Sequence, residues 1–315
     1  MTRVAAIDCG TNSIRLLVAD VDAATGTLVD VDRRMEIVRL GQGVDRTGRI
    51  SPDAMERTLA TVRFYGALVA QHGAQRLRFV ATSATRDASN QDDFVDGVQR
   101  LLGVEPEVVT GDEEARLSFV GATRGLDAGH AGPFLVVDIG GGSTEVVLGG
   151  ADVEAARSVD VGCVRLTERH GLDDPPTTSQ VVAARADVDA ALDRVAEVVP
   201  LERTRTLVGL AGSVTTVTAR ALGLTAYDSA RIHGATLPVE VVRQACDDLL
   251  RMPKARRSAL PYMHPGRVDV IGAGALVWRR VVDRVVDATA GTEHPLAFAV
   301  TSEHDILDGI AHSLV

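Results

Sequence analysis

The chain has 315 residues, and 45% of them are apolar, which is enough for two ordinary domains with separate cores. Aromatic residues make up only 3%, so the cores must rest on Val, Leu, Ala and Ile, as in Val-rich sheets covered by helices. The formal charge of −10 argues against a nucleic-acid partner, because such proteins usually carry a broad basic surface. No apolar run approaches the roughly 20 residues of a membrane span, and MTRVAAID lacks the regions of a secretion signal. We therefore expect a cytosolic (cytoplasmic) protein without a membrane partner.

The three cysteines, Cys9, Cys163 and Cys246, lie far apart in the sequence and lack the spacing of metal ligands. Their odd number argues against a disulfide framework. We expect them to be small, buried, apolar residues.

The first half of the chain predicts strands and helices in the order βββαβαβα. Two strands form a hairpin from Ala5 to Asp20, and LVDVDRRMEIVRL continues as a third. A helix follows with clear end signals, because Ser51 suits the N-cap, Pro52 the first turn and Gly73 the position just past the end. The remaining elements are a strand, a helix, a strand and a helix, in RLRFVATS, QDDFVDGVQRLLG, EPEVVT and DEEARLSFVGATRGL.

The second half predicts the same order with extra helices inserted. Three strands, FLVVDI, EVVLGG and DVEAARSVDV, precede a helical region from Thr177 to Val199. The strand TLVGLAG, the helix SVTTVTARALG, two helices (Val239 to Arg251 and Val268 to Val286), the strand AFAVTS and a terminal helix follow. The turn-rich GLDAGHAG, 125–132, predicts the boundary between domains 1–125 and 126–315, with room for the terminal helix to pack back on the first domain.

The two hairpins are copies of one pattern. AAIDCGTNSIRLLVAD, 5–20, aligns without a gap on LVVDIGGGSTEVVLGG, 135–150. Arg15 lies opposite Glu145, the one position where the charge reverses. Glycines in such a turn allow close approach to the backbone, whose N–H groups can form an anion-binding nest. We therefore expect two similar domains that face each other across a cleft and hold a chain of phosphates. The aligned residues are Asp8 with Asp138, Gly10 with Gly140 and Ser13 with Ser143.

Seven motifs in order resemble the exopolyphosphatase and guanosine pentaphosphate phosphohydrolase (Ppx/GppA) family: AIDCGTNSIRLLVAD, RLGQGVDRTGRIS, VATSATRDASN, TGDEEARLSFVG, VVDIGGGSTEVVLG, GLAGSVTT and RVDVIGAGALV. The resemblance implies an α/β fold of two actin-like (ribonuclease H-like) ATPase-fold domains around a central cleft. It covers essentially the whole chain. The motifs end within this two-domain core, without the helical C-terminal region of longer family members, which leaves chain-length preference and processivity open.

Hydrolysis of a terminal phosphoanhydride needs neutralised phosphoryl oxygens, a positioned water and a base. Backbone N–H groups and hydroxyls of the two loops suit the oxygens, and arginines add positive charge. A solvated position is the alternative for Arg86, as an outward strand position is for Arg15. Arg267 could extend a basic path for a polymer. The predicted phosphate-binding residues are Thr11, Asn12, Ser13, Arg15, Arg86, Gly140, Gly141, Gly142 and Ser143, with Gly212 and Ser213 added by the resemblance of GLAGSVTT to the second-domain glycine turn.

The carboxylates of Asp8, Asp138 and Glu145 are oxygen ligands suited to a hard cation, and we expect Mg²⁺, with Mn²⁺ as a substitute. Asp138 is the first choice for direct contact, and the other two act directly or through water. Capping of the hairpin turn is the alternative role for Asp8.

Two glutamates, Glu113 and Glu114, begin the helix after TGD and are the candidates for the catalytic base. An acid in the first turn of a helix is ordinarily a dipole-favoured residue without catalytic duty. The family resemblance places the catalytic glutamate on Glu114. Glu113 points about 100° away around the helix.

The expected activity is that of an exopolyphosphatase, which removes the terminal phosphate of inorganic polyphosphate. Conversion of pppGpp to ppGpp is the alternative, because both substrates present the same terminal anhydride. Alternatives from other classes are an actin-like ATPase or kinase, which needs a nucleotide-base pocket, and a (p)ppGpp-binding regulator without catalysis. The intact Glu114, Asp138 and Glu145 speak against the regulator. We also expect ppGpp as an inhibitor and allow a homodimer.

Overall fold

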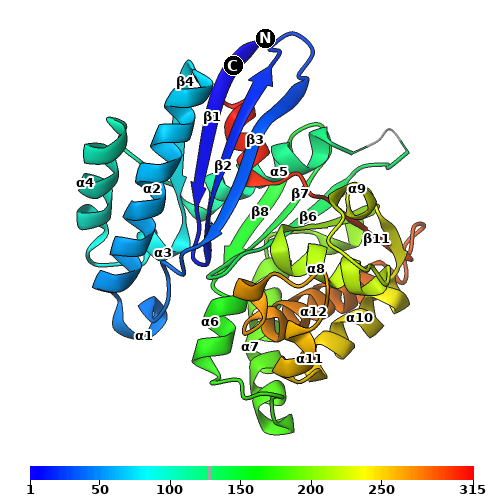
Figure 1. The fold of residues 1–315 in the computed structure, drawn as a ribbon. Helices are drawn as coiled ribbons and strands as arrows, with labels where there is room; N and C mark the ends of the chain where they lie inside the picture. Colours follow the sequence, from blue (N-terminus) through cyan, green and yellow to red (C-terminus); the bar gives the residue numbers. More distant parts are fainter. Residues whose placement is uncertain (127–128) are drawn as a thin grey trace. The chain divides into compact units, whose positions relative to one another are not determined.

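The structure, a computed structural model, describes residues 1–126 and 129–315 and divides into two compact units (Figure 1). Unit 1 comprises Met1–Gly121 with Ile306–Val315, and unit 2 comprises Ala122–Asp305. Residues 127 and 128 of the predicted boundary segment, 125–132, lie outside the described residues. The division into domains at 125/126 stays a prediction, and each unit is described below by itself.

Unit 1 is built on a five-stranded sheet in the order β3-β2-β1-β4-β5. β1 (Thr2–Cys9) pairs antiparallel with β2 (Ser13–Val21) and parallel with β4 (Arg76–Ala81). β3 (Leu28–Ile37) forms one edge, and β5, predicted over EPEVVT, keeps only Glu107–Val108 at the other. The hairpin is therefore held between neighbours on both sides.

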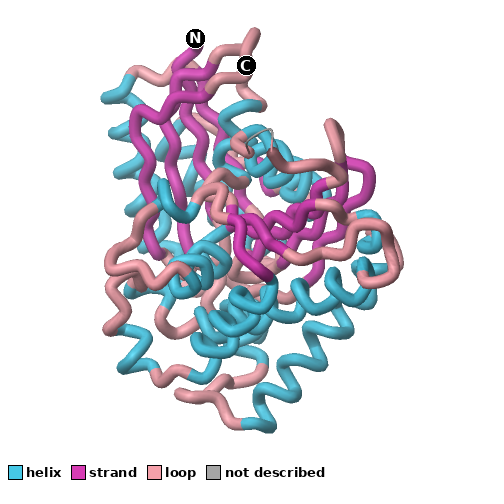
Figure 2. Tube along the Cα trace, turned by 90° about the vertical axis from the view of Figure 1, so that its right-hand side faces the viewer, coloured by secondary structure: helices cyan, strands magenta, loops and turns pink. Residues whose placement is uncertain are grey.

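Helices cover both faces of this sheet (Figures 1 and 2). Alternation along β1 separates the faces: Ile7 and Cys9 pack toward α2 and α4, whereas Val4 and Ala6 pack toward α5 and α13. The end signals predicted for the long helix are confirmed, because the Ser51 hydroxyl accepts from the Ala54 N–H and Gly73 is left-handed with φ 68°. The helices are α1 (Val44–Thr47), α2 (Pro52–His72), α3 (Ser83–Arg86), α4 (Gln91–Leu102), α5 (Gly111–Arg124), which runs across the division between units, and α13 (Ile306–His312).

Unit 2 is built on a six-stranded sheet in the order β10-β11-β9-β6-β7-β8. β6 (Phe134–Ile139), β7 (Thr144–Gly149) and β8 (Val153–Val159) form an antiparallel meander, and β9 (Thr206–Leu210) pairs parallel with β6. β10 (Thr236–Pro238), which the sequence did not predict, pairs antiparallel with β11 (Phe298–Thr301).

The helices predicted for the second half are all present, and all but the terminal helix, α13, lie in unit 2. α10 (Val239–Arg251) has its predicted bounds, and α12 (Ile271–Thr289) begins three residues later than predicted because the short turn η2 (Pro265–Arg267) precedes it. Unit 1 thus carries the predicted βββαβαβα order of the actin-like (ribonuclease H-like) fold, and the helix that ends this order in the second half of the chain, α13, belongs to unit 1. The other elements are α6 (Cys163–Arg169), α7 (Thr178–Ala196), η1 (Leu201–Arg203), α8 (Ala211–Ala221), α9 (Ser229–Ile232) and α11 (Lys254–Ser258).

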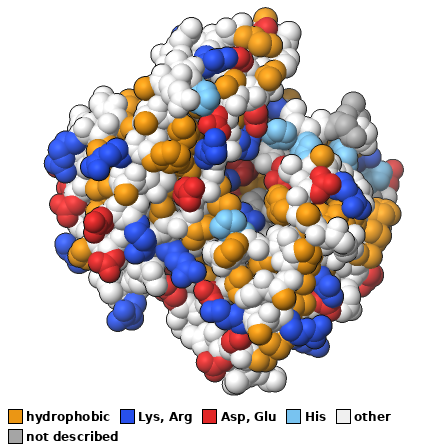
Figure 3. Space-filling view, viewed as in Figure 1, with side chains coloured by type: hydrophobic (Ala, Val, Ile, Leu, Met, Phe, Trp, Pro, Cys, Tyr) orange, Lys and Arg blue, Asp and Glu red, His pale blue; other side chains and the backbone are white. Residues whose placement is uncertain are grey.

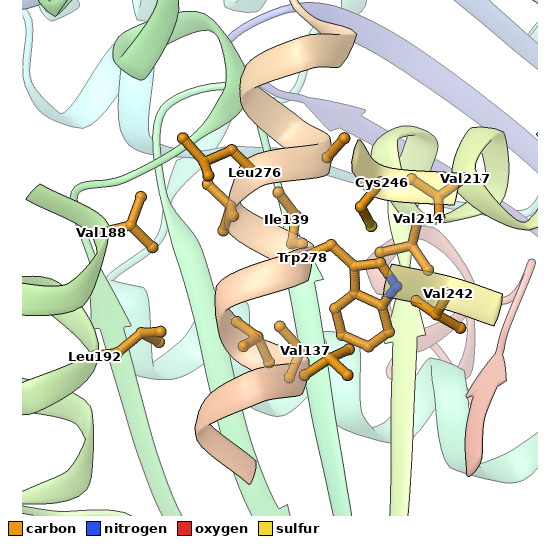
Figure 4. Packing of buried hydrophobic residues seen from close by; sticks show 14 of the residues in the cluster. Val137, Ile139, Val188, Leu192, Val214, Val217, Val242, Cys246, Leu276 and Trp278 are labelled. Atoms are coloured by element: carbon orange, nitrogen blue, oxygen red, sulfur yellow. The ribbon is translucent and has the colours of Figure 1, made fainter. Parts of the chain in front are cut away.

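The core of unit 2 gathers around α12, whose Trp278 is 1% exposed. Figure 4 shows this indole among Val137 of β6, Val214 of α8 and Val242 of α10. A Cβ on Gly209 would lie 2.7 Å from the indole ring, so the strand must carry glycine where the ring crosses it. The largest aromatic side chain therefore fixes how α12 lies on the sheet.

The three cysteines are free and buried, as predicted. Burial raises the pKa of each thiol, and for Cys9 the neighbouring Asp8 carboxylate raises it further. We expect these thiols to stay protonated near neutral pH.

Acidic and basic side chains are interspersed over the face shown in Figure 3. Many of them form ion pairs, such as Arg33 with the buried Asp308 at 2.6 Å and Arg280 with Asp283 at 2.8 Å. Within residues 1–126 and 129–315, no helix combines the length and hydrophobicity needed to cross a membrane.

Candidate active site

The two aligned hairpins have the same backbone geometry. Asp8 pairs with Arg15 across β1 and β2, and Asp138 pairs with Glu145 across β6 and β7. In loop 1 (residues 10–13) the Gly10 N–H donates to the Ser13 carbonyl at 2.9 Å, and in loop 2 (residues 140–143) the equivalent bond is 3.0 Å. The repeat read from the sequence is therefore a structural repeat.

The first turn of α6 donates hydrogen bonds to the carbonyls of loop 2. The Gly140 carbonyl accepts from the Cys163 N–H at 3.0 Å, and the Gly141 carbonyl accepts from the Val164 N–H at 2.9 Å. Among the described residues, the N–H groups that follow these carbonyls, those of Gly141 and Gly142, donate to no backbone carbonyl. Because C=O and N–H point in opposite directions in a trans peptide, those N–H groups face away from α6. This arrangement can bind an anion.

The carbonyls of loop 1 are also bound by backbone N–H groups, which here come from residues 38–41. The Asn12 carbonyl accepts from the Val38 N–H at 3.1 Å, and the Thr11 carbonyl accepts from the Gly41 N–H at 2.9 Å. Gly41 must be glycine, because a Cβ there would lie 2.3 Å from the methyl carbon of Thr11. The Thr11 hydroxyl is 2.9 Å from that of Ser83, so it is held against α3. The hydroxyl of Thr11 is therefore already engaged in a hydrogen bond within unit 1.

Asp8 and Arg15, predicted as a metal ligand and a phosphate ligand, contact each other. The Arg15 guanidinium donates to Asp8 Oδ2 through Nε at 2.9 Å and through a terminal nitrogen at 2.6 Å. The carboxylate of Asp8 is 5% exposed and the Arg15 side chain 20%. The guanidinium of Arg15 therefore neutralises the carboxylate of Asp8 within unit 1.

Unit 2 has two acids at the equivalent positions. Asp138 is 7% exposed and Glu145 1% exposed, and the Ser158 hydroxyl donates to Glu145 Oε1 at 2.7 Å. Two carboxylates on neighbouring strands repel each other at low dielectric, and a hard divalent cation relieves that repulsion. The described residues contain no cluster of three or more His, Cys, Asp or Glu side chains suited to a metal. The two buried carboxylates are oxygen ligands of the kind that a hard divalent cation prefers.

Arg86 and Glu114, far apart in the sequence, meet in unit 1. Arg86 ends α3, and one of its terminal nitrogens donates to the Val109 carbonyl at 2.9 Å and to Glu114 Oε2 at 3.3 Å. Glu114 lies in the first turn of α5 and is 7% exposed. Glu113 points elsewhere, because its side chain is 42% exposed and contacts Arg78 at 3.4 Å. Only the second glutamate thus has the buried, arginine-supported setting of a candidate base.

The guanidinium of Arg267 lies against the backbone of Gly212. A Cβ at this position would lie 2.4 Å from Cζ of Arg267, so the absence of a side chain lets Arg267 lie against the backbone. Ala211, just before it, is one of two non-glycine residues with positive φ in the described chain, at 67°. Sequence reasoning considered Arg267 only as part of a basic path, because 55 residues separate it from the turn that it covers.

Ser213 links the glycine turn to loop 2 through Cys163. Burial raises the pKa of the Cys163 thiol, and the neighbouring Ser213 hydroxyl lowers it in part. The N–H of Cys163 donates to the Gly140 carbonyl at 3.0 Å. A Cβ on Gly274 of α12 would lie 2.1 Å from the Ser213 hydroxyl, so α12 carries a glycine where it contacts this turn. Unit 2 therefore brings together loop 2, the turn at 212–213 and the acid pair.

Comparison with known proteins matches residues 17–290 to the Ppx/GppA phosphatase family. Exopolyphosphatase 2 of Mycobacterium tuberculosis is 51% identical over 321 residues, which is 100% of this chain and 99% of that protein. The crystal structure of an exopolyphosphatase-like protein superposes with a TM-score of 0.96 at 46% identity and covers 99% of this chain and 97% of its own.

A guanosine-5'-triphosphate,3'-diphosphate pyrophosphatase of Aeromonas salmonicida is 36% identical over 212 residues. This match covers 67% of the present chain and 42% of the Aeromonas protein, so the similarity extends over part of each chain rather than over the whole enzyme. The matches to the family and to the full-length relative cover loop 2, the acid pair and the glycine turn. The chain therefore belongs to the Ppx/GppA phosphatase family.

Proposed function

We propose that this chain is an exopolyphosphatase that hydrolyses the terminal phosphoanhydride of inorganic polyphosphate. The observation that carries the proposal is the identity of 51% to exopolyphosphatase 2 along the full length of both chains. The chemistry of the described residues supports it, because loop 2 offers outward N–H groups beside two buried carboxylates.

In this proposal unit 2 holds the phosphoryl group. The N–H groups of Gly141, Gly142 and Ser143 bind its oxygens, with Gly140 placing the turn, and the guanidinium near Gly212 adds positive charge. A divalent cation bound by Asp138 and Glu145 would neutralise the charge on those oxygens. We expect Mg²⁺, with Mn²⁺ as a substitute, since all the protein ligands are carboxylate oxygens.

We propose Glu114 as the general base. Glu114 accepts the proton of the attacking water, and Arg86 holds its carboxylate through the contact at 3.3 Å. Backbone groups of Thr11, Asn12 and Ser13 bind further phosphates. Arg15 acts mainly by neutralising Asp8, which leaves Asp8 a weaker candidate for the metal than the acids of unit 2.

The second candidate is hydrolysis of pppGpp to ppGpp. It is favoured by the Aeromonas relative, although that match covers a smaller part of both chains. The two substrates share the terminal anhydride and differ in the group attached beyond it, which is a chain of phosphates in one and a nucleoside in the other. The choice between them is one of relative kcat/KM.

The test is phosphate release measured side by side on short polyphosphate, long polyphosphate, pppGpp and ATP, each with Mg²⁺, Mn²⁺ or EDTA. We expect polyphosphate to give the highest kcat/KM and EDTA to abolish release. Dominant pppGpp turnover would select the second candidate. Dominant ATP turnover would point to an ATPase or kinase, and tight ppGpp binding without hydrolysis of any substrate to a regulator.

The same assay tests the expected regulation. We propose that ppGpp competes with substrate, because its diphosphates can occupy the same N–H groups, and the competition should appear as a higher KM at unchanged kcat. Sedimentation velocity will show whether the protein forms a homodimer.

A further inference from the structure

The first turn of α6 binds three successive peptide groups of loop 2. Two of the three are bound by its backbone: Cys163 N–H donates to the Gly140 carbonyl at 3.0 Å, and Val164 N–H donates to the Gly141 carbonyl at 2.9 Å, which the N–H of Arg165 also reaches at 3.1 Å. The approach is so close that a Cβ on Gly162 would lie 2.5 Å from the Gly141 carbonyl carbon. The helix terminus is therefore built against the loop.

The third peptide group is bound by a side chain. Nε of Arg165 donates to the Gly142 carbonyl at 2.7 Å, a short distance that fits a charged donor. Arg165 thus binds two neighbouring carbonyls, one through its backbone and one through its guanidinium. Sequence reasoning did not single out this residue.

Each bound carbonyl fixes one N–H group of the loop, because a peptide unit is planar and trans. The Gly140 carbonyl fixes the N–H of Gly141, and the Gly141 carbonyl fixes the N–H of Gly142. The Gly142 carbonyl fixes the N–H of Ser143. The last peptide follows a glycine, which can adopt many backbone conformations, and the side chain of Arg165 binds its carbonyl.

We propose that Arg165 is a positioning residue, which holds the Gly142–Ser143 peptide so that the Ser143 N–H faces the bound phosphate. The inference rests on the proposed function for its effect on catalysis. It assigns to Arg165 the orientation of a donor rather than contact with the substrate. A preorganised N–H stabilises developing charge better than one that must first rotate.

Three substitutions separate positioning from charge. Glutamine has its amide nitrogen the same number of bonds from Cα as Nε of arginine, so Arg165→Gln keeps a donor for the Gly142 carbonyl without the charge. Arg165→Lys keeps the charge but places a methylene at that position, and Arg165→Met removes both. Arg169→Gln, one helical turn later and paired with Asp187 at 2.9 Å, is the matched control.

We expect kcat/KM on short polyphosphate to fall about ten- to a hundredfold in the Met and Lys variants, somewhat less than when a donor is deleted outright. The Gln variant should recover most of that loss, and the control should match the unmodified protein. Higher activity in Lys than in Gln would overturn the proposal and make Arg165 a charge that acts on the substrate. Equal losses in Lys and Gln, or no loss in Met, would also overturn it.

A structural measurement keeps the inference independent of activity. In a crystal structure of Arg165→Met, the Gly142–Ser143 peptide should be rotated, whereas Arg165→Gln should keep it. An unchanged peptide in the Met variant would overturn the proposal. If the unmodified protein releases no phosphate from any substrate, the proposed function fails, and the crystal structures alone decide the role of Arg165.

Discussion

Asp138 and Glu145 are direct partners across β6 and β7, at the offset where Asp8 and Arg15 pair across β1 and β2. One hairpin therefore carries an internal ion pair, and the other carries two buried carboxylates. The two hairpins therefore share a backbone geometry but differ in the charge of their paired side chains. The unit with two acids is the one suited to a cation.

The carboxylates of Asp138 and Glu145 should destabilise the protein when no metal is bound and stabilise it when a divalent cation is bound. In EDTA, Glu145→Gln should raise the melting temperature by about 2–4 °C, as expected for roughly 1 kcal/mol of relieved repulsion in a protein of this size. Added Mg²⁺ should stabilise the unmodified protein and leave the variant unchanged. Differential scanning calorimetry will measure both. Glu154→Gln, on the same sheet and paired with Arg203 at 2.6 Å, is the control; an equal Mg²⁺ response in all three proteins would exclude Glu145 as a ligand.

The buried glutamate of α5 predicts a loss of turnover without a loss of binding. Glu114→Gln keeps an oxygen for the contact with Arg86 but removes the base, so kcat should fall about 10²- to 10⁴-fold at nearly constant KM. Steady-state phosphate release will show this. Glu113→Gln, which removes an exposed carboxylate on the other side of the helix, should keep nearly full activity. Wild-type turnover in Glu114→Gln would mean that another group is the base.

The ion pair of loop 1 predicts a stability loss that a second substitution recovers. Arg15→Met leaves the buried Asp8 carboxylate without its guanidinium and should cost about 3 kcal/mol, at the lower end for a broken buried pair because Arg15 is partly exposed. Asp8→Asn combined with Arg15→Met should restore much of this free energy of unfolding. Guanidinium chloride titrations of the two single variants and the double variant form the required cycle. Additive losses would show that the pair is not coupled.

The contacts of Asp187 predict a stability difference that acid removes. Burial would raise the pKa of this carboxyl, but hydrogen bonds from Arg169 and His170 lower the pKa overall. Its folded pKa therefore lies below the unfolded one, so its contribution is complete above the unfolded pKa and disappears as pH falls through the folded pKa. Asp187→Asn should lower the melting temperature at pH 7, and the difference from the unmodified protein should shrink as the pH falls through the folded pKa of Asp187. A difference that grows on acidification would contradict this assignment.

Sequence reasoning predicts best where the signal is local. The alternation in β1, the caps at Ser51 and Gly73 and the repeated turn each depend on a few adjacent residues, and all three are present in the structure. The gapless alignment even predicts the backbone of the second loop from the first. The signal for each of these features lies within a short segment of the sequence.

Contacts between residues that are distant in the sequence could not be predicted. α6 has seven residues and begins after Gly162 without a side-chain cap, so nothing in its own sequence marks it as the support of loop 2. Asp8 and Arg15 were given separate tasks, although the hairpin register that the sequence implied makes them direct neighbours. The contact of Arg267 with Gly212 arises from the tertiary fold, and no sequence pattern links two residues that lie 55 positions apart.

The position of Trp278 has a practical consequence for spectroscopy. It is the single tryptophan of the chain and is sealed inside unit 2. Emission excited at the red edge of indole absorbance will thus report on the melting of one half of the molecule alone. Circular dichroism sees both halves, so comparing the two signals during denaturation will reveal whether the duplicated halves unfold together or in succession.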